Sequence, residues 1–307
     1  MLAFGAFRSW IVRRPPNFSL CLRCLSLPAE PDADDAALEE QLLGFPGGSV
    51  DLKLHDESEG ENSGLAVITL NNPRHRNAFS GVMMVEMRRA VEKLEVWQDG
   101  KGLILHGSGN AFCSGSDLNA VRAMSTTQDG MMMSLYMQNT LARLQRLPIL
   151  SVALVQGKAL GGGAELTTAC DFRLMSPYGE ICFVHKHMGL VPGWGGVTHL
   201  SRILGPCTTL RIIAGATRLN PDEALALGLA DAILESSEET LAFAEAMRWL
   251  GHLTRGPAEV TRAIKKAVIM ASEHKMEDSL ANERTIFGTL WGGPANVAAL
   301  QKRIKHK

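Results

Sequence analysis

The chain has 307 residues, enough for one or two domains, and its 46% apolar and 21% charged residues are close to the averages of globular proteins. These shares exclude a largely disordered or fibrous chain. The net charge of −1, from 31 basic and 32 acidic residues, argues against nucleic acid or an anionic membrane as a partner.

The first 29 residues differ from the rest because they contain four arginines and no acidic residue. An Arg-rich, acid-free segment with scattered serines is typical of a mitochondrial transit peptide, and an ordinary disordered tail is the alternative. Residues 28–48 are rich in Pro, Gly and acids, which indicates a linker with room for one short helix. We therefore predict a disordered tail and linker over 1–45, a core over 46–250 and a helical region over 251–307.

Apolar runs and helical patterns alternate through the core. We expect strands at 65–70, 102–106, 149–155 and 172–175. Ser80 is the predicted N-cap of a helix after the first strand, and a second helix is expected near 130–147. Strands that are apolar throughout, joined by helices, are typical of an α/β fold with a buried sheet. Later helices are predicted at 206–214, 221–228, 238–252, 257–274 and 277–290. No run of 18 apolar residues occurs, so we expect no membrane span.

Two glycine-rich loops follow predicted strands, at 106–118 and 155–165. Each loop leads into a helix, whose first N–H groups have no partner within the helix. Two such ends that face each other would offer two backbone donors to one oxygen, which is an oxyanion hole. The alternative is that the glycines serve only packing or phosphate binding, although no phosphate-binding G-x-x-x-x-G-K-[ST] sequence is present.

The motifs occur in a specific order: N-P-R-H-R-N-A at 72–78, G-x-x-x-A-F-x-x-G-x-D-L at 107–118, A-L-G-G-G-x-E-L at 159–166 and V-P-G-W-G-G at 191–196. Over about 64–300 this series resembles the crotonase superfamily, the enoyl-CoA hydratase/isomerase fold. The segments at 114–121, 165–175, 183–186 and 291–296 resemble its branch that decarboxylates ethylmalonyl-CoA. The resemblance implies an α/β spiral of β-β-α units with a C-terminal helical region, assembled as a homotrimer or a dimer of trimers.

The resemblance also implies the residues of the site. The N–H groups of Ser116 and Gly162 would hold an acyl-CoA thioester carbonyl, and Glu165 and His185 would be the catalytic side chains. Asp117 is expected to hold its loop, and Trp194 to narrow the acyl end. The remaining predicted substrate contacts are Arg76, Ala78, Leu118 and Gly161. Lys265 and Lys266 are expected on a solvated helix face, and a contact with CoA phosphates is the alternative.

Hydration of an enoyl thioester needs two carboxylates, one to activate water and one to deliver a proton. His185 aligns where hydratases have the second one, so we expect decarboxylation of ethylmalonyl-CoA to butyryl-CoA, with methylmalonyl-CoA a weaker substrate. His185 would orient the substrate carboxylate or protonate C2, while His187, expected on the other side of a strand, would be structural or on the surface. The alternatives are an enoyl-CoA hydratase or isomerase and a non-catalytic or RNA-binding relative. No metal or other cofactor is expected, and the resemblance favours the cytosol over the mitochondrial matrix.

Overall fold

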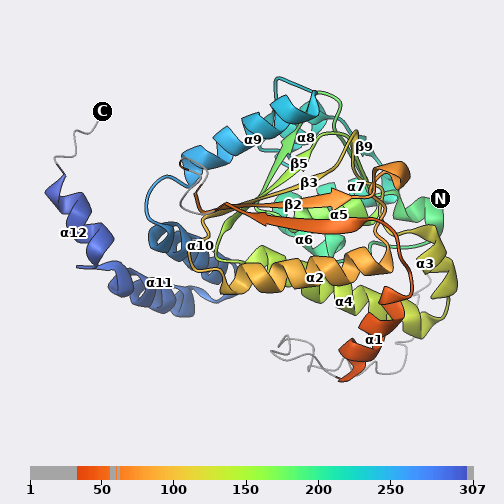
Figure 1. Ribbon diagram of the computed structural model, residues 1–307, viewed down its shortest axis with the longest axis horizontal. Helices are drawn as coiled ribbons and strands as arrows, with labels where there is room; N and C mark the ends of the chain where they lie inside the picture. Colours follow the sequence, from red (N-terminus) through yellow and green to blue (C-terminus); the bar gives the residue numbers. More distant parts are fainter. Residues whose placement is uncertain (1–32, 56–59, 61–62, 303–307) are drawn as a thin grey trace, which may run out of the picture.

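The computed structural model describes residues 33–55, 60 and 63–302. The segment 1–29, on which the targeting prediction falls, lies outside the described residues. A six-stranded sheet has the order β1-β2-β3-β5-β7-β10, and a four-stranded sheet has the order β4-β6-β8-β9 (Figure 1). The large sheet contains Ser49–Leu54 (β1), Leu65–Asn71 (β2), Gly102–Gly107 (β3), Leu150–Val155 (β5), Phe172–Met175 (β7) and Ala232–Ile233 (β10). The small sheet contains Ala111–Cys113 (β4), Lys158–Leu160 (β6), Glu180–Cys182 (β8) and Arg218–Leu219 (β9).

The chain alternates between the two sheets and adds a helix each time. β3 leads to β4 and then to α3 (Leu118–Ala123) and α4 (Thr127–Arg146). β5 leads to β6 and α5 (Gly162–Thr168), and β7 leads to β8 and α6 (Gly196–Leu204). β2, β3, β5 and β7 pair in parallel. These repeats are the β-β-α units that the family resemblance implies.

The central strands are buried on both faces because helices cover each side of the sheet. Leu103 and Leu105 of β3 pack in the larger core cluster, while Ile104 between them packs with Leu250 in a second cluster. Helix α9 (Glu239–Leu253) covers the second face, and α2 (Gly81–Val96) lies with α4 on the other (Figure 1). Ser80 caps α2 as predicted, since its hydroxyl accepts from the N–H of Met83 at 3.1 Å. The boundary predicted after residue 250 lies inside α9.

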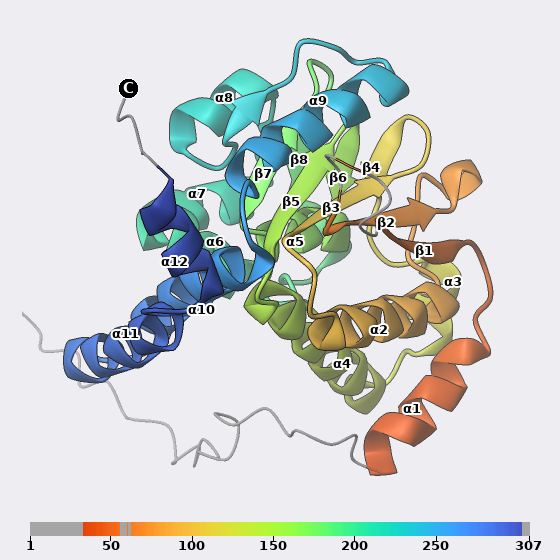
Figure 2. The ribbon, with the colours of Figure 1, turned by 60° about the vertical axis from the view of Figure 1, so that its left-hand side comes forward.

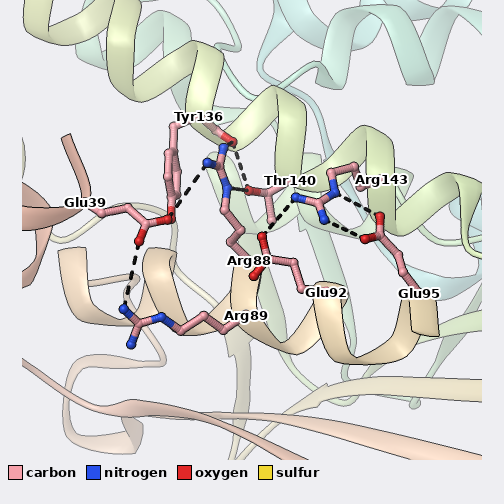
Figure 3. A network of polar contacts seen from close by, with 8 residues as sticks. All are labelled: Glu39, Arg88, Arg89, Glu92, Glu95, Tyr136, Thr140 and Arg143. Carbon is pink, nitrogen blue, oxygen red and sulfur yellow. Dashed lines mark hydrogen bonds and ion pairs between the residues drawn. The ribbon is translucent and has the colours of Figure 1, made fainter. Parts of the chain in front are cut away.

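The N-terminal helix α1 (Ala33–Leu43) corrects part of the expected disordered segment. Its Leu38 and Leu42 are buried in the main core. Glu39 accepts a hydrogen bond from the Tyr136 hydroxyl at 2.8 Å, and the Arg88 guanidinium stacks 3.5 Å from the centre of the Tyr136 ring (Figure 3). This helix and the following strand β1, which the sequence analysis did not predict, are therefore ordered parts of the fold.

The C-terminal region is helical, as predicted. After Pro206–Gly215 (α7), Pro221–Leu227 (α8) and α9 come Ala258–Glu273 (α10), Met276–Leu290 (α11) and Pro294–Gln301 (α12). Helices α11 and α12 extend to one side of the sheets (Figure 2), and neither contains a buried residue. In the part of the chain that is described, no helix has the length and apolar character needed to cross a bilayer.

Candidate active site

The two glycine-rich loops lie against each other, as an oxyanion hole built from them would require. Ser116 forms an isolated parallel bridge with Phe79. A methyl group placed on Gly115 would lie 3.1 Å from the Leu160 carbonyl oxygen and 3.2 Å from the backbone nitrogen of Gly162. Gly115 has a φ of 94°, a left-handed conformation that favours glycine. The close approach of these loops brings Ser116 and Gly162 to one location.

The backbone around Ser116 is fixed while its own N–H stays free. Phe79 donates its N–H to the Gly115 carbonyl at 2.8 Å and accepts from the N–H of Asp117 at 2.8 Å. Among the described residues, the N–H groups of Ser116 and Gly162 donate no hydrogen bond. Gly162 is the first residue of α5, where an N–H has no partner within the helix. Two unpaired donors at one location can stabilise an oxyanion.

Asp117 holds its loop, as expected. Its carboxylate is the N-cap of α3 and accepts from the N–H groups of Asn119 and Ala120 at 2.7 and 3.4 Å. Leu118, the first residue of this helix, is 47% exposed.

The predicted CoA path begins at a strained turn that the sequence analysis did not recognise. Arg76 and Asn77 have φ values of 52° and 55°, and such conformations cost about 1–3 kcal/mol each in non-glycine residues. The Asn77 side chain is fully buried and donates to the Ser108 and Ala111 carbonyls at 2.9 and 2.8 Å. These bonds hold Arg76 exposed and Ala78 buried beside the loop of Ser116. Asn77 of the 72–78 motif is a signal for this turn, because asparagine tolerates a positive φ better than most residues.

Glu165 is 1% exposed, and its carboxylate accepts four hydrogen bonds. Oε1 accepts from His185 at 2.9 Å and from the N–H of Gly193 at 3.2 Å. Oε2 accepts from the N–H groups of Trp194 and Gly196 at 2.7 and 2.8 Å. An ionised carboxylate has about four lone-pair sites, so none is left to activate a water molecule. In this arrangement Glu165 holds the 193–196 loop, and its catalytic role stays a prediction.

His185 lies between Glu165 and the loop of Gly161. Because the Glu165 carboxylate can only accept, His185 donates through Nε2. Its Nδ1 is buried and has no partner among the described residues. A methyl group on Gly161 would lie 3.9 Å from His185 Nε2, so the imidazole lies beside the glycine loop that precedes Gly162.

The expectation that His187 faces the other side of a strand is wrong, because His185 and His187 lie in a short 3-10 helix, Val184–Met188 (η4). His187 is exposed there, in agreement with its reading as a surface residue.

Trp194 forms an apolar wall of the site. It is 4% exposed, and its ring meets that of Phe79 edge-on at 5.7 Å between centroids. A methyl group on Gly162 would lie 2.7 Å from Cζ3 of the indole. The indole therefore rests on the α-carbon of Gly162, and its effect on the acyl end stays a prediction.

Two residues of the site had not been singled out from the sequence. Ser134 and Gln138 of α4 donate to the carbonyl oxygen of Gly193 at 2.5 and 2.9 Å. Their spacing of four residues puts them on one face of the helix, but nothing local in the sequence indicates what they contact.

The proposal of a phosphate contact by Lys265 is wrong. Its side chain is buried and forms an ion pair with Asp171, whereas the neighbouring Lys266 is exposed. No group of three or more His, Cys, Asp or Glu residues that could hold a metal ion occurs within residues 33–55, 60 and 63–302.

Comparisons with known proteins point to one family. Residues 60–292 match the family model described as enoyl-CoA hydratase/isomerase. A relative from Gallus gallus named ethylmalonyl-CoA decarboxylase is 55% identical over 274 residues, 89% of this chain and 90% of the relative. Its namesake from Xenopus laevis is 54% identical over 286 residues, 93% of each chain. The crystal structure of an enoyl-CoA hydratase from Bacillus anthracis superposes with a TM-score of 0.74 at 23% identity, covering 82% of this chain and 94% of that one. This likeness confirms the expected crotonase-like fold.

Proposed function

The chain belongs to the enoyl-CoA hydratase/isomerase family, and we propose that within it the chain decarboxylates ethylmalonyl-CoA to butyryl-CoA, with methylmalonyl-CoA a weaker substrate. The names of relatives that are 54–55% identical over nearly the whole chain support the substrate. The observation that carries the proposal in the structure is the state of Glu165, whose carboxylate is fully occupied by four N–H donors. An oxyanion hole without a free carboxylate suits a reaction whose substrate supplies its own electron pair.

The reaction balances without a second reactant other than a proton. The bond between C2 and the carboxylate carbon breaks, CO₂ leaves, and its bonding electron pair forms the enolate of the thioester. A proton then adds to C2 and gives butyryl-CoA. The enolate oxygen carries the negative charge between these two steps, so it is the atom that the protein must stabilise.

The N–H groups of Ser116 and Gly162 are the donors that we assign to this oxygen. Both lack partners among the described residues and lie where the two loops touch. Each donor of this kind contributes about 3–4 kcal/mol to the transition state in enzymes where it has been measured. Trp194 and Phe79 exclude water beside the hole, which strengthens these bonds.

We assign to His185 the contact with the substrate carboxylate or the delivery of the proton to C2. Glu165 holds Nε2 of the ring, so Nδ1 is the nitrogen left for the substrate. A proton on Nδ1 would make this nitrogen a donor to the substrate carboxylate. Decarboxylation in D₂O tests the second role: a stereospecific transfer gives one enantiomer of 2-deuterated butyryl-CoA, and His185→Ala should give the racemate at a reduced rate.

One assay separates this function from the hydratase alternative. The purified protein is incubated with ethylmalonyl-, methylmalonyl- and crotonyl-CoA, and the products are identified by mass. We expect loss of CO₂ from the first thioester, slower loss from the second and no hydration of the third. Hydration of crotonyl-CoA without decarboxylation would contradict the proposal.

We further propose that the protein forms trimers or pairs of trimers and uses no metal or other cofactor. Helix α11 has no buried residue, and its large apolar side chains Leu280 and Phe287 are 57% and 59% exposed. Exposed apolar side chains of this kind suit a helix that packs against another subunit. Light scattering of the purified protein measures the assembly, and dialysis against EDTA should leave activity unchanged. The cytosol stays our proposed location, tested by imaging the full-length chain with a C-terminal fluorescent tag.

A further inference from the structure

The peptide group between Gly193 and Trp194 is held from both of its polar ends. Its N–H donates to Glu165 Oε2 at 2.7 Å. Its carbonyl oxygen, that of Gly193, accepts from the hydroxyl of Ser134 at 2.5 Å and from Nε2 of Gln138 at 2.9 Å. A peptide group is planar, so bonds at both ends fix its orientation and with it the direction in which the Trp194 side chain leaves the backbone.

Helix α4, which carries Ser134 and Gln138, is anchored to its neighbours. It begins with a capping box between Thr126 and Asp129. Between the two donors, Tyr136 binds Glu39 of α1, and near its end Arg143 binds two glutamates of α2 (Figure 3). The donors to Gly193 therefore project from a helix that cannot easily shift relative to the core.

This anchoring fixes the position of the Trp194 indole beside the proposed oxyanion hole. Trp194 rests on the α-carbon of Gly162, whose N–H is one of the two assigned donors. In the proposed complex the Gly162 N–H binds the thioester oxygen. C2 is bonded directly to the carbon that carries this oxygen, so a side chain next to the Gly162 N–H can contact the substituent on C2. A displaced indole would change both the space for that substituent and the exclusion of water.

We propose that Ser134 and Gln138 are positioning residues that hold Trp194 against Gly162 and thereby set the size of the C2 substituent that the site accepts. The proposal rests on the proposed function, because the substituent is that of a malonyl-type thioester. Neither side chain needs to touch the substrate. They act on the position of Trp194 through their hydrogen bonds to the carbonyl oxygen of Gly193.

The first test compares Ser134→Ala, Gln138→Glu and the double variant with the parent. Gln138→Glu keeps the shape of the side chain but removes the donor. For ethylmalonyl-CoA we expect kcat of the double variant to fall roughly tenfold, with KM changed less than about twofold, because a misplaced wall acts on the transition state. Selectivity between methylmalonyl-, ethylmalonyl- and propylmalonyl-CoA should become weaker. Ser272→Ala and Gln98→Glu make the same chemical changes at exposed positions elsewhere. They serve as matched controls, and we expect them to have no effect.

The second test measures the indole itself. Acrylamide quenching of Trp194 fluorescence is obtained as the difference between each protein and its Trp194→Phe counterpart. Quenching should increase in the Ser134 and Gln138 variants and stay unchanged in the controls. Gln138 is exposed, so its variant keeps the test open even if the Ser134 variant does not fold.

The possible outcomes separate the two proposals. Parental kcat, selectivity and quenching in the variants would overturn the positioning role, and so would a lower melting temperature as their only effect. A parent that decarboxylates none of the thioesters would instead refute the proposed function. The quenching result would then still decide whether Ser134 and Gln138 hold Trp194.

Discussion

Replacement of Gly162 by alanine tests the contact between Gly162 and Trp194 on which the proposed oxyanion hole depends. The added methyl group would lie 2.7, 2.8 and 2.9 Å from three carbon atoms of the Trp194 indole. The optimal van der Waals separation of two carbon atoms is about 3.5–4.0 Å, so either the indole or the backbone of Gly162 must move by about 1 Å. A displacement of that size at a reacting centre costs about a hundredfold in rate. We therefore expect kcat for ethylmalonyl-CoA to fall about a hundredfold in Gly162→Ala.

A double-mutant cycle identifies the cause of the loss. In a Trp194→Ala background the added methyl group has room, so Gly162→Ala should cost less than about fivefold there. Formation of butyryl-CoA is followed by mass for the four proteins. Gly251→Ala is the control, because a methyl group at that helical position meets nothing within 4 Å. An equal loss in both backgrounds, or a Gly162→Ala protein with parental kcat, would refute the reasoning.

Three further changes test the groups around this contact. Glu165→Gln puts an NH₂ group where a carboxylate oxygen now accepts two N–H groups, so the unfolding free energy in urea should fall by about 2 kcal/mol or more; an unchanged value would contradict the clamp on the loop. Burial lowers the pKa of His199 from 6.5, so the folded state favours the neutral ring and stability falls as the pH drops below about 6.5, where the unfolded chain binds the proton first. His199→Asn should reduce that acid-side loss in urea titrations, whereas an unchanged slope would exclude His199 as its source. Lys265→Ala leaves Asp171 without its buried partner and should cost about 3–5 kcal/mol, while Lys266→Ala, at an exposed position, should cost nothing measurable.

The parts of the fold that the sequence predicted are those with local signals. β3 and β5 are apolar apart from His106 and Ser151, and each is followed by glycines whose conformations only a glycine adopts easily. Helix α1 has a weaker signal, because its acidic sequence is typical of a linker and indicates a short helix without indicating that it packs on the core. What makes it part of the fold is the burial of Leu38 and Leu42 and the contact of Glu39 with Tyr136, which lies 97 residues away in the sequence. Such a contact cannot be inferred from spacing.

The same limit explains why the site could be located from the sequence but the state of Glu165 could not. The resemblance implied Glu165 as a site residue, and the structure puts its carboxylate at hydrogen-bond distance from His185. Its three backbone donors come from residues 28 to 31 positions further along the chain, in a loop whose path is set by tertiary packing. The donors Ser134 and Gln138 depend on that path too.

The occupation of Glu165 changes what the site can do. A general base needs a free lone pair within reach of the proton that it removes, and here each oxygen of Glu165 already accepts from two N–H groups. Abstraction of a proton or activation of water by this carboxylate would require the 193–196 loop to break away from it, and the apolar wall of Trp194 would move with the loop. Decarboxylation needs no such movement of the loop, because the electron pair comes from the bond between C2 and the carboxylate that leaves as CO₂. The hydrogen bonds that occupy Glu165 also hold the backbone of Trp194, whose indole lies beside Gly162, one of the two donors that we assign to the enolate oxygen.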